Sequence, residues 1–140
     1  LKMKKIILLM MIFILSGCAG MRYGNYTQMS GSKDDFLVSD VTSRIVKIYP
    51  AAKNTFRLSQ KICDGFGLKL IEKLRRSGYG IVENVQDKQQ ANFFYVVDES
   101  ISEKKLTYRV SVYISNQSIS RAYTMINGQL QPLTAWTYKE

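Results

Sequence analysis

Histidine is absent from this 140-residue sequence, and cysteine and proline occur only twice each. Without histidine, Ser–His and Cys–His nucleophile pairs and most zinc sites are excluded. The sequence also has no glycine-rich phosphate-binding loop followed by lysine and serine or threonine. We therefore expect no catalytic residues, no metal site and no cofactor, and we expect that the protein is not an enzyme.

The acidic residues offer little for acid–base catalysis. Asp34-Asp35 and Asp98-Glu99 are sequence neighbours, and neighbouring side chains on a helix or strand do not face each other. Glu83 and Asp98 could meet across a sheet, but one such pair is weak evidence for a site. These carboxylates therefore do not change the expectation that the protein is not an enzyme.

A hydrophobic run long enough to cross a membrane is also missing. The apolar run Ile6–Leu15 covers about 15 Å as a helix, whereas a bilayer core needs about 30 Å, and Arg22 stops any extension. Lys2, Lys4 and Lys5 precede the run, which is the arrangement of a secretory signal peptide.

The run ends in Leu15-Ser16-Gly17-Cys18, which resembles the bacterial lipobox. The resemblance implies that residues 1–17 are a lipoprotein signal peptide and that Cys18 carries palmitate-type acyl chains. Several chains on one cysteine would anchor the protein stably. A plain signal peptide with a cysteine there by chance is the alternative.

Ala19 follows the cysteine, in place of the aspartate that usually retains lipoproteins in the inner membrane. The lipobox resemblance therefore implies an outer-membrane location, lipid-anchored and facing the periplasm of a Gram-negative bacterium. Leu1 as the first residue indicates a non-standard start codon or a true start at Met3.

Lipidation would leave Cys63 as a single thiol, so no internal disulfide is expected in the mature chain. We expect a buried thiol, and the alternative is an intermolecular disulfide. The net charge of +9 falls to +6 when the three signal lysines leave. The remaining charges are scattered, which favours an ordinary solvated surface.

Residues 18–34 are predicted to be the lipidated cysteine and a flexible tether. Glycines and serines interrupt Ala19–Lys33 without helical or strand periodicity, giving a reach of roughly 20 Å. This segment also contains aromatic and cationic residues that a simple spacer does not need, namely Arg22, Tyr23 and Tyr26. We expect them to order against a partner or to rest on lipid headgroups.

Two amphipathic helices are predicted, over Asp35–Tyr49 with Asp34 as N-cap and over Gly65–Arg76 with Asp64 as N-cap. A proline follows the first helix, and Gly78 is the expected residue just past the second. The positions expected to face the core are Leu37, Val38, Val41, Ile45, Ile48, Phe66, Leu70, Ile71 and Leu74.

Period-2 alternation then predicts a run of strands. Asn127-Gly128 is the strongest hairpin signal, because both positions of a type I′ turn need a positive φ. Residues 35–140 are therefore expected to form a single small α+β domain, two helices packed on one mainly antiparallel sheet with a C-terminal β-meander. The expected strands are Thr55–Leu58, Gly80–Val85, Asn92–Val97, Leu106–Ile114, Ser118–Met125 and Leu130–Tyr138.

Aromatic residues on the strands are candidates for contact with a partner. Tyr113, Tyr123 and Trp136 are the expected partner-binding residues of the sheet. Arg109, Tyr113, Arg121 and Tyr123 could instead form a stacking platform for single-stranded nucleic acid, or simply cover the solvent face. The scattered charge does not favour direct nucleic-acid contact.

The order of these features over the mature chain resembles the TrbH family. The quoted motifs are Cys18, Tyr23-Gly24-Asn25-Tyr26, Ile48-Tyr49-Pro50-Ala51-Ala52, Phe66-Gly67, Arg76-Ser77-Gly78-Tyr79, Tyr108-Arg109-Val110, Ser118-Ile119-Ser120-Arg121-Ala122-Tyr123, Asn127-Gly128 and Ala135-Trp136.

The resemblance implies a conjugal transfer lipoprotein of the mating-pair-formation apparatus, a type IV secretion system. Its expected function is that of a structural component of the channel, acting with the core-complex proteins through protein–protein interaction. No catalytic residues come with the resemblance. A free-standing periplasmic lipoprotein that binds a ligand or inhibits an envelope enzyme is the alternative.

Overall fold

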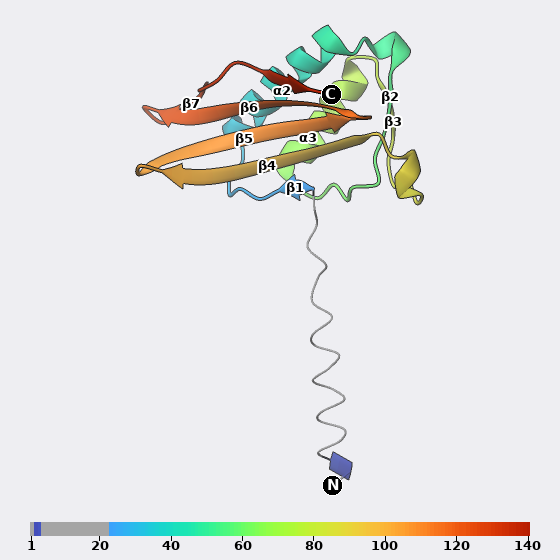
Figure 1. The fold of residues 1–140 in the computed structure, drawn as a ribbon, viewed down its shortest axis with the longest axis horizontal. Coiled ribbons are helices and arrows are strands. Elements are labelled where there is room, and N and C mark those ends of the chain that lie inside the picture. The colour runs from blue at the N-terminus through green and yellow to red at the C-terminus, as the bar shows by residue number, and fades with distance from the viewer. Residues whose placement is uncertain (1, 4–22) are drawn as a thin grey trace.

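The computed structural model describes residues 2–3 and 23–140. In this part of the chain, two α-helices lie side by side on one face of a mainly antiparallel sheet (Figure 1). The predicted α+β fold class with its C-terminal meander is confirmed. The helices are α2 (Ser32–Ile48) and α3 (Gly65–Arg76), with 3₁₀ turns at Ala51–Lys53 and Lys88–Gln90. The strands are β1 (Gly24–Asn25), β2 (Thr55–Arg57), β3 (Gly80–Val82), β4 (Phe93–Ser102), β5 (Lys105–Ile114), β6 (Gln117–Ile126), β7 (Gln129–Pro132) and β8 (Thr137–Lys139).

The main sheet has the order β1-β4-β5-β6-β7, and β8 also pairs with β6. Consecutive antiparallel pairing of β4, β5 and β6 makes the meander, whereas β1 pairs with β4 in parallel. Asn127 and Gly128 both have positive φ, as the type I′ hairpin requires. The predicted last strand is divided into β7 and β8, because Pro132 ends β7 and has no N–H with which to continue a ladder.

β2 and β3 form a separate two-stranded parallel sheet, connected through α3. The side chain of Asn92 takes the place of a further strand beside β2. Its Oδ1 accepts a hydrogen bond from the Arg57 amide (2.7 Å), and its Nδ2 donates to the Thr55 carbonyl (3.0 Å). This junction ties the small sheet to the start of β4.

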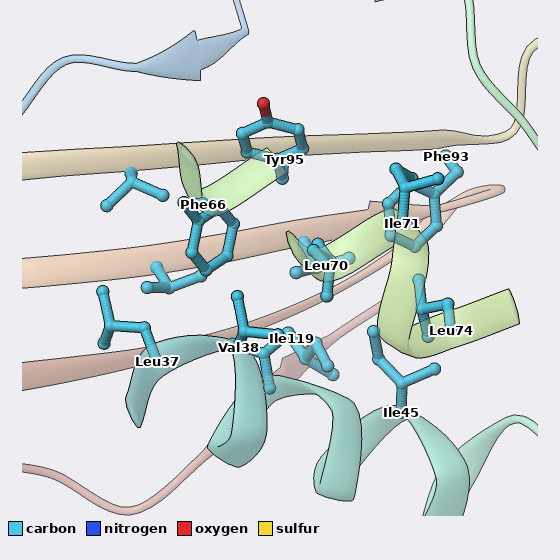
Figure 2. Close-up of a cluster of buried hydrophobic side chains, with 14 of the residues drawn as sticks. Leu37, Val38, Ile45, Phe66, Leu70, Ile71, Leu74, Phe93, Tyr95 and Ile119 are labelled. Atoms are coloured by element: carbon cyan, nitrogen blue, oxygen red, sulfur yellow. The ribbon is translucent and has the colours of Figure 1, made fainter. Parts of the chain in front are cut away.

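The core lies between the helices and the facing side of the main sheet (Figure 2). Alternate residues of each long strand point to this side, as the pleat of a strand dictates. All the predicted core-facing helical residues are buried except Ile48, which is partly buried against the cluster. From the sheet, the core receives Phe93, Tyr95, Val97, Tyr108, Val110, Val112, Ile114, Ile119, Tyr123 and Leu130.

The two helices run in the same direction. Lys69 contacts Asp35 (Nζ–Oδ1 2.9 Å), and one turn later Lys73 donates to Ser39 Oγ (3.3 Å). Their dipoles are therefore aligned, which is electrostatically unfavourable. Acidic residues occupy both N-terminal ends and basic residues both C-terminal ends, so the side-chain charges oppose this cost.

The observed N-cap of α3 is the predicted residue, whereas the observed N-cap of α2 is not. Asp64 caps α3, accepting a hydrogen bond at Oδ1 from the Gly67 amide (2.9 Å), and Gly78 follows the helix with φ 94°. The first helix begins three residues earlier than predicted, with Gly31 at the N-cap position. Asp34 is not a cap: it lies in the first turn, only 2% exposed.

The predicted tether also overlaps the folded domain. Gly24 and Asn25 pair with Val96 and Val97 of β4, and α2 begins at Ser32. Residues 23–34 therefore belong to the domain, because the sheet offers a free strand edge with which this polar segment can pair. Residues 18–22 lie outside the described part.

Cys63 is exposed, so the expectation of a buried thiol is wrong. It lies in the surface loop that precedes the cap of α3. Phe66 and Leu70, in the first turns of the helix, occupy the core instead.

Candidate functional site

The point at which the N-terminal segment joins the domain is the first candidate site. Tyr23 lies against the face of the sheet opposite the helices. Its ring stacks on Phe94 (centroids 4.4 Å apart) and meets Tyr113 edge-on (5.7 Å). We refer to Tyr23, Phe94 and Tyr113 as the aromatic cluster. Cys18 and Arg22, the other predicted residues of this region, lie outside the described residues.

Backbone pairing holds Tyr23 in place. β1 follows it immediately, and the Tyr26 amide donates to the Val97 carbonyl (2.8 Å). Asn25 Oδ1 then accepts from the amide (2.9 Å) and hydroxyl (2.7 Å) of Thr27, which turns the chain away from the sheet. Tyr26 is left 53% exposed. Part of the predicted Arg22–Tyr26 contact segment is thus ordered against the chain's own sheet.

The aromatic cluster lies on a face of the sheet that no described helix covers (Figure 1). Phe94 and Tyr113 are direct cross-strand partners on β4 and β5. Phe94 is partly buried under Tyr23, whereas Tyr113 stays 37% exposed. Tyr113 is therefore accessible from solvent, and its contact with a partner stays a prediction.

Tyr123 is not available, because it points to the helix side and is fully buried. Its hydroxyl donates to Asp40 Oδ2 on α2 (2.6 Å), and the Arg121 guanidinium bonds both oxygens of the same carboxylate (3.0 and 3.1 Å). Burial and Asp40 together raise the pKa of Tyr123. The hypothesis of Tyr123 as a partner-binding residue is wrong.

The predicted nucleic-acid platform is also not assembled. Arg121 pairs in register with buried Val110, so it lies on the helix side with Tyr123. Arg109 and Tyr113 are on the opposite face. Strand pleating separates the four residues into two pairs on two sides of the sheet.

Trp136 stands over Arg121, with the guanidinium carbon 5.6 Å from the ring centroid. The indole is partly buried against the core, and Arg121 Nε donates to the Thr134 carbonyl (2.8 Å). Trp136 thus covers the Asp40–Arg121 ion pair. Its role in this structure is to close the edge of the core, and only part of its surface is open to a partner.

A polar cluster at the N-terminal ends of the helices escaped the sequence analysis. The Tyr95 hydroxyl donates to Asp64 Oδ2, while Asp64 Oδ1 holds the Gly67 amide and lies 3.4 Å from Asn25 Nδ2. Burial, followed by the hydrogen bond to Asp64, raises the pKa of Tyr95. The feature of the sequence that could have indicated this cluster was the pair of glycines on either side of Phe66.

Asp34 lies beside this cluster, and its Oδ1 is buried without a hydrogen-bond partner. Burial raises the pKa of the carboxyl group, Lys69 opposes the shift, and the negative charges of Asp64 and Asp35 add to it. The Asp34 carboxylate also occupies the space beside Gly65, where a Cβ atom would lie 2.8 Å from Oδ2. The arrangement joins the starts of α2 and α3 to the sheet.

A groove of about 360 Å³ runs between α2 and α3 on the outer side of the helix layer. Two of its cations are paired, Lys69 with Asp35 and Arg76 with Glu72. Outside the groove, Arg75 pairs with Glu83 (2.7 Å), which directly follows β3 of the small sheet, whereas Asp98 lies on β4 of the main sheet. The groove is lined by Asp35, Val38, Lys69, Glu72, Lys73, Arg76 and Ser77.

Among the described residues, no three or more histidine, cysteine, aspartate or glutamate side chains are placed to hold a metal ion. No helix in residues 23–140 is both long and apolar enough to span a membrane. These residues form a small α+β domain whose polar clusters join its helices to its sheet.

The comparisons with known proteins identify the family. A family model described as conjugal transfer protein TrbH matches residues 19–140. The chain belongs to the TrbH family, and the predicted resemblance is confirmed. No curated protein and no solved structure matches it. The chain is thus a component of conjugal transfer.

Proposed function

We propose that this protein is an outer-membrane lipoprotein of a conjugative type IV secretion system, anchored through Cys18 and contributing protein contacts. Membership of the TrbH family supports a role in conjugal transfer. The lipobox-like Leu15-Ser16-Gly17-Cys18 supports the anchor, and Ala19 supports outer-membrane sorting. The partners are the core-complex proteins of the channel.

The position of Tyr23 is the observation on which the proposal depends most. The chain between Cys18 and Tyr23 has a covalent reach of at most about 18 Å. Because Tyr23 is packed on Phe94, lipid on Cys18 would hold the domain close to the membrane. The aromatic cluster and the β1 edge would be on the near side, where tyrosine and arginine side chains suit the headgroup region.

The test compares two cysteine substitutions in a conjugating donor strain. Cys18→Ser is expected to abolish labelling by palmitate, release the protein from the outer-membrane fraction and impair DNA transfer. Cys63→Ser is the matched control, because this exposed thiol makes none of those contributions, and it should leave all three readouts unchanged. Wild-type transfer by a Cys18→Ser protein shown to lack lipid would refute the proposal.

A second measurement addresses the partners. Extraction of the membrane in a gentle detergent should recover the protein together with channel components. Tyr26 and Tyr113 are the exposed aromatic residues near the anchor. Alanine at both positions should weaken this co-purification, whereas a protein recovered as a lone monomer would indicate the free-standing alternative.

A further inference from the structure

The face of the main sheet opposite the helices is identified by the register of its strands. Residues paired directly across neighbouring antiparallel strands point to the same side of the sheet. One continuous row of this kind consists of Phe94 on β4, Tyr113 on β5, Ser118 on β6 and Lys139 on β8. We refer to the side of the sheet that carries this row as the open face, because no described helix covers it (Figure 1).

Four charged side chains of the strands point to the open face. Lys105 and Arg109 lie an even number of residues before Tyr113 on β5, so the alternation of the strand puts them on its side. They and Lys139 are exposed cations. Asp98, the acidic residue of the four, pairs in register with Arg109. The strands therefore bring two more positive than negative charges to this face.

The charged residues that border these strands leave the balance unchanged. Glu103 and Lys104 are neighbours in the turn between β4 and β5, and their charges offset each other. Glu140 follows β8, and desolvation together with the charge of Glu140 raises the pKa of the Tyr138 hydroxyl. Tyr138 pairs with buried Ile119, so it points to the helix side. Glu140 thus lies beside a side chain of the helix side.

The cations of the open face have no acidic partner of their own. Each ion pair among the described residues includes a side chain of α2 or α3, and none includes Lys105, Arg109 or Lys139. A long cationic side chain without a fixed partner can reach an anion outside the protein. The helix layer also has exposed cations outside these pairs, such as Lys47, so charge alone does not distinguish the two faces.

The point at which the chain enters the domain does distinguish them. Tyr23 stacks on Phe94, so the chain from Cys18 arrives over the open face. That connection spans at most about 18 Å. The helices lie on the other side of the sheet (Figure 1). A bilayer that holds Cys18 through lipid therefore meets the open face before it can meet Lys47 on α2.

The middle of the open face favours a lipid surface over a protein. Apart from Val96, the side chains next to the aromatic cluster are small, namely Ser111, Ser120 and Ala122. A stable protein interface has an apolar core, which these rows do not supply. A second copy of the chain would bring the cations of two open faces together. The phosphate groups of a membrane instead match cations that have no acidic partner.

We propose that the open face lies on the membrane that holds Cys18, with Lys105, Arg109 and Lys139 contacting the phosphate groups of anionic lipids. The aromatic cluster, at one end of the face, lies at the level of the headgroups. This inference rests on the proposed lipid anchor. It names the surface of the domain that the membrane covers and the class of lipid that this surface prefers.

The test measures how fast individual lysines are acetylated by a membrane-impermeant, anionic ester. The full mature chain is held on preformed vesicles of phosphatidylethanolamine and phosphatidylglycerol, and mass spectrometry quantifies each modified lysine. Compared with the same protein in neutral detergent micelles, Lys105 and Lys139 should react more slowly by about threefold or more. Lys47 should react equally fast in both, because the surface potential falls off within about 10 Å at 0.1 M salt.

Two comparisons show whether charge holds the face on the membrane. On vesicles of phosphatidylcholine alone, the slowing at Lys105 and Lys139 should be largely lost. Arg109→Gln keeps both reporter lysines and should shift the equilibrium about fivefold toward the undocked domain. Lys73→Gln on α3 is the matched control, because it makes the same change of charge on the helix layer, and it should leave the pattern unchanged.

The experiment separates this inference from the lipoprotein proposal. If cells add no lipid to Cys18, the anchor proposal fails. The Cys63→Ser protein can then be coupled through its Cys18 thiol to a maleimide lipid, and the same lysines are measured on the same vesicles. The pattern of acetylation therefore tests the open face whether or not the natural anchor exists.

Four results would overturn the inference. Equal slowing of Lys47 and Lys139 would mean that no one face is covered. Equal slowing on neutral vesicles, or an unchanged pattern in Arg109→Gln, would mean that anionic lipid is not recognised. Slowing of Lys105 and Lys139 by a single-stranded oligonucleotide in micelles, without slowing on vesicles, would assign the open face to nucleic acid.

Discussion

The hydroxyl of Tyr95 on β4 donates a hydrogen bond to Oδ2 of Asp64, the residue that caps α3. The tyrosine reaches the cap across the backbone of Gly67, where a Cβ atom would lie 2.0 Å from the hydroxyl oxygen. One carboxylate thus joins the sheet, the helix cap and, through Asn25, the N-terminal strand. The contact places the start of α3 directly over β4.

Gly67→Ala tests this close approach. The added methyl group must displace the Tyr95 ring, so we expect a loss of unfolding free energy of about 3 kcal/mol. Chemical denaturation measures it. Leu68→Ala, at an exposed position of the same helix, should cost no more than about 0.5 kcal/mol. In a Tyr95→Phe background the alanine should cost less, and an equal cost would show that the contact is not the cause.

Asp34→Asn tests the buried carboxyl group. Its pKa is raised above the ordinary 3.8, so the folded state disfavours the charged form. The contribution of Asp34 to stability is thus fully present below pH 3.8 and declines as pH rises through the raised pKa. Asparagine should match wild type near pH 3 and exceed it by about 1 kcal/mol at pH 7. A difference independent of pH would contradict the assignment.

Removing the Asp40 carboxylate should cost more unfolding free energy than removing one of the groups that donate to it. Asp40→Ala leaves both the Tyr123 hydroxyl and the Arg121 guanidinium without this carboxylate, so we expect a loss of about 3 kcal/mol. Tyr123→Phe removes one hydrogen bond and should cost about 1 kcal/mol. A double-mutant cycle measured by urea denaturation gives the coupling. Additive effects would show that the two bonds act independently.

Lengthening the connection after Ala19 tests the proximity of the domain to the membrane. Twenty inserted glycine and serine residues add a root-mean-square reach of about 25 Å. Because the described contacts of the domain begin at Tyr23, we expect unchanged lipid labelling and thermal stability but reduced DNA transfer. Transfer at the wild-type rate would show that the domain need not be held near the anchor.

The exposure of Cys63 predicts its reactivity. In the lipidated protein, a maleimide reagent should modify one thiol per chain under native conditions, because Cys18 would be blocked by lipid. Mass spectrometry counts the adducts, and Cys63→Ser should show none. A thiol that reacts only after denaturation would contradict the exposed position.

The elements with strong local signals were predicted well. Both helices, the Asp64 cap and the Asn127-Gly128 hairpin follow from side-chain spacing and backbone preference within a few residues. The start of α2 was missed for two reasons. Its N-cap residue is Gly31, which has no side chain that would indicate a cap. Asp34 has a side chain typical of an N-cap residue, although it lies within the first turn. β1 was missed because two residues have no periodicity and form a strand only when β4 is beside them.

The candidate residues on the sheet were predicted less well. Alternation shows that Arg121 and Tyr123 share one face but does not say on which face the helices pack. Arginine on a strand suggests a solvent face, and here Asp40, 81 residues away from Arg121 in the sequence, accepts its charge on the helix side. The expectation of a buried Cys63 was wrong for a similar reason, because the burial of a loop residue depends on which distant segments of the chain pack over the loop.

By itself, the sequence determined the class of the fold, the family, the lipobox-like motif and the lack of histidine chemistry, because these depend on local patterns and composition. The tertiary structure decided which face of the meander is covered and where Tyr23 docks. Those features arise from contacts between residues far apart in the chain, and local periodicity carries no information about such contacts.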